Sequence, residues 1–308
     1  MSKNIKLFLI FFVLSIFFWW GTDITQKNVE DFFYMQEMKK NPPLLFSANI
    51  TRNLFEKSEK LEIKGESAIS VKIDKNGNEN ILFKKLENQK MPIASLTKLM
   101  TSITASEFYD PDIKFRISKQ AVKQEEETGS LKVGEILTLN ELLKIALIES
   151  SNDAAFAIGD LIGEKGFVDL MNMQIQDMGI KNTYFFNSTG LDPEDENESP
   201  NISTTEDLVK IVKHLLKKPD ILDILSKKSY DLYLENGEFH HTLINTNILI
   251  EEIPMIIGGK TGYTEKAGGC LILILRGKSP ETYLINVILN SPNKFQDMER
   301  LIEYTYTH

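Results

Sequence analysis

The sequence predicts a mixed α/β (α+β) protein in which one antiparallel sheet is divided by an inserted all-helical subdomain. Alternating apolar residues near the start of the folded part, at 69–83, indicate a β-hairpin. Apolar residues then recur with helical spacing from about 117 to 232, and two apolar strand-like runs, 270–275 and 283–289, follow. Strands at both ends with helices between them favour a single split sheet, and a cleft between the two parts is the natural place for a site.

Length, composition and charge narrow the range of functions. The chain has 308 residues, of which 42% are hydrophobic and 26% are charged, as in ordinary globular proteins. Its formal net charge of −9 argues against nucleic acid or anionic lipid as the main partner, because both favour basic surfaces. The single cysteine, Cys270, excludes an intramolecular disulfide framework.

Residues 1–21 are predicted to be a membrane anchor or a signal segment. Lys3 and Lys6 precede an apolar run at 7–20, and Asp23 follows it. Lysines before the run favour an N-terminus inside the cell and a body outside it. A cleaved signal peptide is the alternative, although no small-x-small cleavage site follows the run. We expect an uncleaved single-pass anchor in the cell membrane, with the folded body on the extracytoplasmic side.

Residues 22–66 are predicted to be a spacer and residues 67–308 the folded body. The spacer is rich in charge, contains a Pro-Pro pair and shows no sustained periodicity. In the body, an Asn-Gly turn at 76–77 joins the strands of the first hairpin. A capping box at Ser203–Glu206 is expected to start one of the helices. The other expected elements are helices over 139–148, 167–178, 208–216 and 295–302 and the paired strands 270–275 and 283–289.

The helix that follows Pro92 carries the first candidate for chemistry. Ser95 lies in its first turn, where free N–H groups favour developing negative charge, and Lys98 stands three residues later on the same face. A serine hydroxyl becomes a good nucleophile when a desolvated amine takes its proton. The alternative is an N-cap serine beside a solvated lysine. The same spacing recurs at Ser291 and Lys294, where a simple turn before the last helix is expected.

Two distant polar segments supply possible partners. Ser150 and Asn152 interrupt an apolar helical stripe, so they are either a proton relay and a substrate-binding amide or the junction between two helices. Lys260, Thr261 and Gly262 follow two glycines before an apolar strand, where a substrate backbone could approach an edge strand. A phosphate-binding loop is excluded, because the position of its first glycine is proline.

Other hydrolase templates and metal sites are excluded by the motifs that they need. The four histidines show no H-E-x-x-H spacing, and the chain has no G-x-S-x-G elbow. A serine hydrolase without a catalytic histidine needs another base, and a lysine is what this sequence offers. We therefore expect no metal and no cofactor.

Three short motifs occur in an order that identifies a family resemblance. Ser95-Leu96-Thr97-Lys98, Ser150-Ser151-Asn152 and Lys260-Thr261-Gly262 correspond to the S-x-x-K, S-x-N and K-T-G set of penicillin-binding proteins and β-lactamases. With Asn187–Leu191 and Asn245–Asn247, the chain resembles the low-molecular-weight, serine-type D-alanyl-D-alanine carboxypeptidases over residues 67–308. The resemblance implies the penicilloyl-transferase/β-lactamase fold, peptidoglycan stem peptides as substrates and β-lactams as covalent inhibitors.

The resemblance also implies a role for each motif residue. Ser95 would attack the carbonyl between two D-alanines, Lys98 would take its proton, and Ser150 would relay a proton to the leaving D-alanine. Lys98 must be neutral to act as a base, so we expect burial and the Lys260 charge to lower its pKa. The oxyanion hole would consist of the N–H groups of Ser95 and Tyr263. The other residues implied to bind substrate are Asn152, Lys260, Thr261 and Gly262.

Two departures from the family leave alternatives open. Many relatives carry a further C-terminal β domain and anchor, whereas this sequence ends with the expected last helix. Relatives also often carry a basic residue at a strand position that we expect to correspond to Tyr283, with Arg276 on the neighbouring strand. Endopeptidase action is therefore an alternative. A β-lactamase is another, although no glutamate in loop 193–201 has an asparagine four residues later, so slow deacylation is expected. The non-enzyme alternative is a membrane-anchored wall-binding protein with a relict site.

Overall fold

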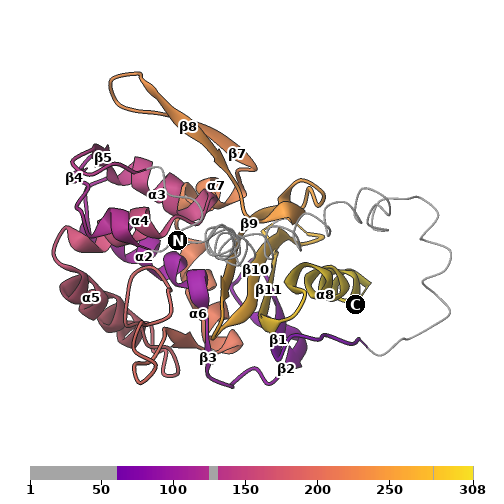
Figure 1. Ribbon diagram of the computed structural model, residues 1–308. Helices are drawn as coiled ribbons and strands as arrows, with labels where there is room; N and C mark the ends of the chain where they lie inside the picture. The colour runs from indigo at the N-terminus through magenta and orange to yellow at the C-terminus, as the bar shows by residue number, and fades with distance from the viewer. Residues whose placement is uncertain (1–60, 125–130, 280, 308) are drawn as a thin grey trace, which may run out of the picture. The chain divides into compact units, whose positions relative to one another are not determined.

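The computed structural model describes residues 61–124, 131–279 and 281–307 (Figure 1). The predicted anchor or signal segment, 1–21, and most of the predicted spacer lie outside these residues. Within the described ranges, no helix combines the length and the hydropathy needed to cross a membrane.

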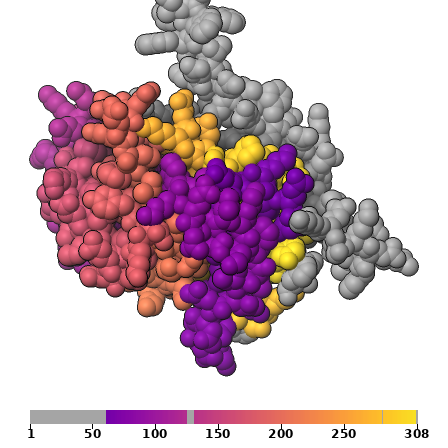
Figure 2. Space-filling model, turned by 90° about the horizontal axis from the view of Figure 1, so that it is seen from below, coloured from indigo at the N-terminus to yellow at the C-terminus, as the bar shows by residue number. Residues whose placement is uncertain are grey.

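The predicted antiparallel sheet is confirmed. In the described part of the chain its strand order is β2-β1-β11-β10-β9, so the first strands of the body pair with the last. In Figure 2, indigo residues from the start of the described chain lie beside yellow and orange residues from its end. β9 forms one edge of the sheet and is paired with β10 on one side. The strands of this sheet are β1 (Ser67–Ile73), β2 (Glu79–Lys85), β9 (Ile256–Thr264), β10 (Gly268–Arg276) and β11 (Tyr283–Ser291).

Helices fill most of the chain between the two groups of strands. They are α2 (Thr97–Phe108), α3 (Leu139–Ile148), α4 (Asn152–Asp160), α5 (Glu164–Asp177), α6 (Thr205–Leu215) and α7 (Pro219–Ser226). The predicted insertion is thus mainly helical, but short strand pairs accompany its helices. These are β3 (Met91–Pro92) with β6 (Ile202–Ser203), β4 (Lys114–Arg116) with β5 (Ile136–Thr138), and β7 (Ser229–Tyr233) with β8 (Phe239–Ile244).

The two sides of the sheet are covered by different helices. The last helix, α8 (Lys294–Thr307), packs on β10 and β11, while α6 packs on β1 and β11 and α7 packs on β9. Figure 1 shows α8 on one side of the sheet and the helical insertion on the other. The edge strand β9 therefore borders the helical part.

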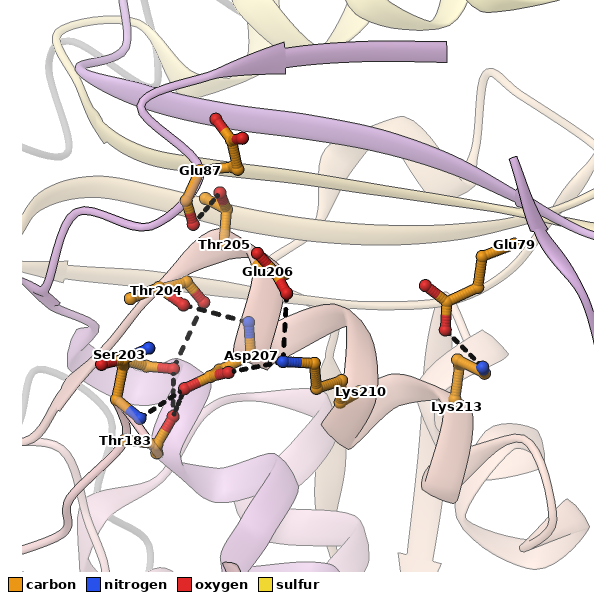
Figure 3. Close-up of polar contacts among 11 residues, drawn as sticks. Glu79, Glu87, Thr183, Ser203, Thr204, Thr205, Glu206, Asp207, Lys210 and Lys213 are labelled. Atoms are coloured by element: carbon orange, nitrogen blue, oxygen red, sulfur yellow. Dashed lines mark hydrogen bonds and ion pairs between the residues drawn. The ribbon is translucent and has the colours of Figure 1, made fainter. Parts of the chain in front are cut away.

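Helix α6 begins one residue later than its predicted capping box. Thr204 is the N-cap, because its hydroxyl accepts a hydrogen bond from the N–H of Asp207. The prediction of Ser203 and Glu206 was wrong by one position, because Ser203 is engaged in the β3–β6 pair. The buried Asp207 carboxylate also binds Lys210, and Thr205 donates to the carbonyl of Glu87 (Figure 3). Contacts of Thr205 with Ser67 on β1 and of Lys213 with Glu79 on β2 join α6 to the sheet.

The end of the predicted spacer contacts the folded body. The N–H groups of Lys64 and Gly65 donate to the buried carboxylate of Asp297 on α8, at 3.0 and 2.7 Å. Lys85 on β2 donates to the carbonyls of Ile63 and Gly65, both at 2.7 Å. Residues 61–66 are therefore held between the edge strand β2 and the last helix.

Candidate active site

Ser95 and Lys98 face each other across a tight turn. Residues Ala94–Leu96 form a 3₁₀ turn directly before α2, and Ala94 has a φ of +46°, in the left-handed region. Lys98 Nζ lies 3.0 Å from Ser95 Oγ, and Lys98 is 1% exposed. The alternative of a capping serine beside a solvated lysine is therefore wrong. So is the expected helix entry at Pro92, which belongs to strand β3.

Lys98 connects the first motif to the second. Its amine lies 2.6 Å from Asn152 Oδ1 and also donates to the carbonyl of Thr189 at 2.9 Å. Asn152 is the first residue of α4, and the side chain of Ser151 caps that helix by accepting from the N–H of Ala154. The interpretation as a helix junction is confirmed, while the proton relay and the substrate-binding amide stay predictions. The junction directs a side-chain amide at Lys98.

Ser150 connects the second motif to the third. It follows the last turn of α3, and its φ of +70° is unusual for a residue with a side chain. Its Oγ accepts a hydrogen bond of 2.8 Å from Nζ of Lys260 on β9. Lys260 is 1% exposed and also donates to the carbonyl of Thr261 at 3.0 Å. Two buried lysines therefore contact one serine each.

The edge strand β9 approaches the Ser95 turn closely at Gly262. A Cβ built on Gly262 would lie 3.1 Å from the backbone nitrogen of Ser95 and 3.1 Å from Cβ of Ala94. A larger residue would displace one of these segments. Tyr263 follows and is 48% exposed, while Thr261 is buried and its hydroxyl lies 2.6 Å from that of Thr246. All eight predicted site residues thus lie on three segments that meet beside Ser95.

The sequence indicated no role for a supporting loop that contacts the Ser95 turn. Gly190 has a φ of +91°, and a Cβ there would lie 2.1 Å from the carbonyl oxygen of Ala94. Asn187 holds this conformation by accepting from the N–H of Gly190 at 2.6 Å. The Asn187–Leu191 motif is the only sign of this loop in the sequence. The carbonyl of Thr189 leaves no sign, because any residue carries one.

The expectation for Tyr283 and Arg276 was wrong. They pair with each other at one end of β10 and β11, whereas Cys270, six residues from Arg276, faces Gly262. At about 3.3 Å per residue, they lie roughly 20 Å along the strands from the candidate site. At the near end, a Cβ on Gly269 would lie 3.4 Å from Cβ of Lys294, so Lys294 is a basic residue on this side.

The nearby histidines belong to a separate cluster. His240 and His241 contact each other through their Nδ1 atoms, and their Nε2 atoms lie 2.9 Å from Glu135 and 3.2 Å from Glu149. Burial raises the pKa of Glu149 to about 7 and lowers the pKa of His241. Across the described residues, no group of three or more His, Cys, Asp or Glu side chains is arranged to hold a metal ion.

Comparisons with known proteins identify the family of the chain. Residues 54–293 match the peptidase S11 family model, described as D-alanyl-D-alanine carboxypeptidase. The chain is 35% identical over 218 residues to the D-alanyl-D-alanine carboxypeptidase DacF of Bacillus subtilis, covering 68% of this chain and 54% of that protein. It is 32% identical over 205 residues to a D-alanyl-D-alanine endopeptidase of Haemophilus influenzae, covering 65% of this chain and 68% of the relative.

A solved structure confirms the predicted fold. Penicillin-binding protein D2 of Listeria monocytogenes, in its cefotaxime-bound form, is 28% identical with a TM-score of 0.68, over 80% of this chain and 98% of that one. The fold is therefore that of the penicillin-binding DD-peptidases. This chain spans about half the length of the Bacillus relative, so the similarity covers only part of that protein. On the family match, which covers most of the chain, this protein belongs to the D-alanyl-D-alanine carboxypeptidase (peptidase S11) family.

Proposed function

We propose that this protein is a serine-type DD-carboxypeptidase, which removes the terminal D-alanine from peptidoglycan stem peptides through an acyl-enzyme. The observation that carries the proposal is the 3.0 Å contact between the hydroxyl of Ser95 and the buried amine of Lys98. Ser95 is half-buried, so a substrate can reach it. Family membership supports the same reaction.

Lys98 is the general base in this proposal. Burial disfavours its charged form, and the second buried lysine in the site, Lys260, adds repulsion between like charges. Neutral Lys98 accepts the hydroxyl proton while Ser95 Oγ bonds to the carbonyl carbon between the two D-alanines. The electron pair moves onto the carbonyl oxygen and gives an oxyanion.

Backbone donors and the second serine complete the reaction. The N–H groups of Ser95 and Tyr263 stabilise the oxyanion, and each such donor typically contributes about 3–4 kcal/mol. Ser150, bonded to Lys260, passes a proton to the nitrogen of the departing D-alanine as the carbon–nitrogen bond breaks. Water then attacks the ester on Ser95 and releases the shortened peptide.

The remaining site residues bind substrate. Asn152 directs its amide at the substrate carbonyl while its oxygen holds Lys98. Lys260 and Thr261 bind the region of the terminal carboxylate, and Gly262 lets the peptide backbone lie against the edge strand β9. β-Lactams acylate Ser95 in place of the peptide, which agrees with the cefotaxime complex of the Listeria relative.

Labelling with a fluorescent penicillin tests the proposal. Full-length protein is expected to become covalently labelled, whereas Ser95→Ala, which lacks the nucleophile, is expected to show no label. Ser291→Ala is the matched control from the second S-x-x-K sequence, where the serine hydroxyl is bonded to Asp297 instead. Equal labelling of wild type and Ser95→Ala would contradict the proposal and favour a wall-binding protein with a relict site.

Cell fractionation of the labelled protein tests its location. We propose that residues 1–21 anchor the chain in the cell membrane with the catalytic domain on the extracytoplasmic side, as the lysine-flanked apolar run indicates. A labelled band in the soluble fraction would contradict anchoring.

An endopeptidase is the second candidate, because the Haemophilus relative carries that name. Mass analysis of defined muropeptides distinguishes them, since a carboxypeptidase releases D-alanine and an endopeptidase cleaves cross-links.

A further inference from the structure

One carboxylate contacts the start and the middle of the turn between β9 and β10. Asp192 Oδ1 accepts a hydrogen bond of 2.9 Å from the hydroxyl of Thr264, the last residue of β9. Asp192 Oδ2 accepts one of 3.0 Å from the backbone N–H of Lys266, inside the turn. The Thr264 hydroxyl also accepts from the N–H of Ala267 at 3.2 Å. Asp192 therefore fixes the turn from a segment that lies 72 residues away in the chain.

The loop that carries Asp192 is also packed against the nucleophile. Gly190, two residues earlier, is so close that a Cβ there would lie 2.9 Å from the backbone nitrogen of Ser95. The loop is braced internally, because the side chain of Asn187 donates to the carbonyl of Leu191 at 3.0 Å. One short segment thus contacts the Ser95 turn at Gly190 and the β9–β10 turn at Asp192.

The two donors of the proposed oxyanion hole lie in the first turn and directly before the second. Ser95 supplies one N–H, and Tyr263, which directly precedes Thr264, supplies the other. β9 is an edge strand, so β10 fixes it on one side only, and its end needs a second support if the donor is to keep its place. Donors in an oxyanion hole act through geometry that is set before the reaction.

We propose that Asp192 is a positioning residue that sets the distance between the Ser95 and Tyr263 N–H groups. This inference rests on the proposed DD-peptidase function. The residue acts through the β9–β10 turn and need not touch the substrate. Its effect should therefore appear in the acylation step, in which the oxyanion forms, and much less in the initial binding of the substrate.

The same loop provides a control for charge. Asp195 is exposed, and its carboxylate accepts hydrogen bonds from the backbone and side chain of Asn197, within the loop itself. Asp195→Asn removes the same charge as Asp192→Asn from nearly the same place. Only Asp192→Asn replaces an oxygen that faces the β9–β10 turn with an amide group, which cannot accept from a second donor.

Acylation kinetics of the full-length protein with a fluorescent penicillin test the proposal. Asp192→Asn is expected to lower the limiting acylation rate constant about 10- to 100-fold, with the dissociation constant of the initial complex changed less than about twofold. Thr264→Val should act in the same direction, because it removes the hydroxyl partner. Thr264→Ser, which keeps the hydroxyl, and Asp195→Asn should stay within about twofold of wild type. Thermal unfolding of each variant verifies that it folds.

Three outcomes would overturn the inference. The first is an acylation rate of Asp192→Asn equal to that of Asp195→Asn in folded protein. The second is a loss for Asp192→Asn that lies wholly in initial binding. The third is Thr264→Val reacting as fast as Thr264→Ser. If wild-type protein is not labelled on Ser95 at all, the proposed function fails instead and this inference fails with it.

Discussion

Two adjacent residues, Glu149 and Ser150, belong to two different polar networks. One is the lysine network of the candidate active site, which consists of Lys98, Lys260 and the side chains that they contact. Ser150 belongs to it through Lys260. Glu149 contacts the histidine cluster through His241. The left-handed backbone of Ser150, with a φ of +70°, separates the two directions. Two residues that are neighbours in the sequence therefore belong to different polar networks at this junction.

The partners in the two networks suit different protonation states. Three hydrogen bonds of Lys98 end on neutral oxygens, those of Ser95, Asn152 and Thr189. Neutral acceptors do not hold an amine in its charged form as a carboxylate would. The histidine cluster instead pairs imidazoles with the carboxylates of Glu135 and Glu149. We infer that the lysine network performs the reaction and the histidine cluster affects stability.

The largest expected effect is the loss of the base in the lysine network. Lys98→Met keeps an unbranched side chain of similar length but removes the amine, so acylation by penicillin should fall by about 10³-fold or more. Time-resolved mass spectrometry of the covalent adduct measures this rate. The matched variant is Lys144→Met, since Lys144 lies over the ring of Tyr230 on the histidine side. An equal loss of acylation rate in both variants would contradict the distinction between the two networks.

A smaller effect is expected for the two serines at the junction. Ser150→Ala removes the partner of Lys260 and the proposed proton relay, so turnover of a D-Ala-D-Ala peptide should fall about 10- to 100-fold. Ser151→Ala removes a helix cap and should cost about 1 kcal/mol of unfolding free energy while turnover stays within a few-fold. Released D-alanine and urea denaturation measure the two quantities. The reverse pattern would exchange the roles of these neighbours.

The smallest effect on activity is expected for Glu149→Gln, which should change stability instead. Burial raises the pKa of Glu149 from 4.5, its value in an unfolded chain, to about 7 in the folded protein. Between these pH values the folded state holds a proton that the unfolded state has lost, so unfolding free energy falls as pH rises. Glu149→Gln should remove about 3 kcal/mol of this fall, with acylation within about twofold of wild type.

His241→Gln provides the opposite sign for comparison. Burial lowers the pKa of His241 from 6.5, so the wild-type protein loses stability through this group as pH falls below that value. The variant should lose that dependence and keep the one due to Glu149. Denaturation of wild type and both variants from pH 4 to 8 measures the two slopes. Parallel slopes in all three proteins would show that the cluster does not couple to folding.

The sequence alone determined what depends on local geometry. An alternation with period two predicted the first hairpin, and helical spacing predicted the chain of helices, because both periods follow from backbone geometry. The neighbouring positions of Ser95 and Lys98 were predictable for the same reason. The second S-x-x-K sequence was also correctly assigned to a turn, since the hydroxyl of Ser291 accepts from the N–H of Asn293.

Only the tertiary structure decided which distant segments meet. Strand register placed Tyr283 at the far end of the sheet, because pairing depends on partners elsewhere in the chain and not on spacing. Pairing of Ser203 in a strand likewise moved the helix cap to Thr204. The burial of Lys98, its contact with the carbonyl of Thr189 and the bracing of β9 by Asp192 arise from packing. The pairing of Ser95 with Lys98 follows from their spacing in the sequence, but its surroundings come from segments that only folding brings together.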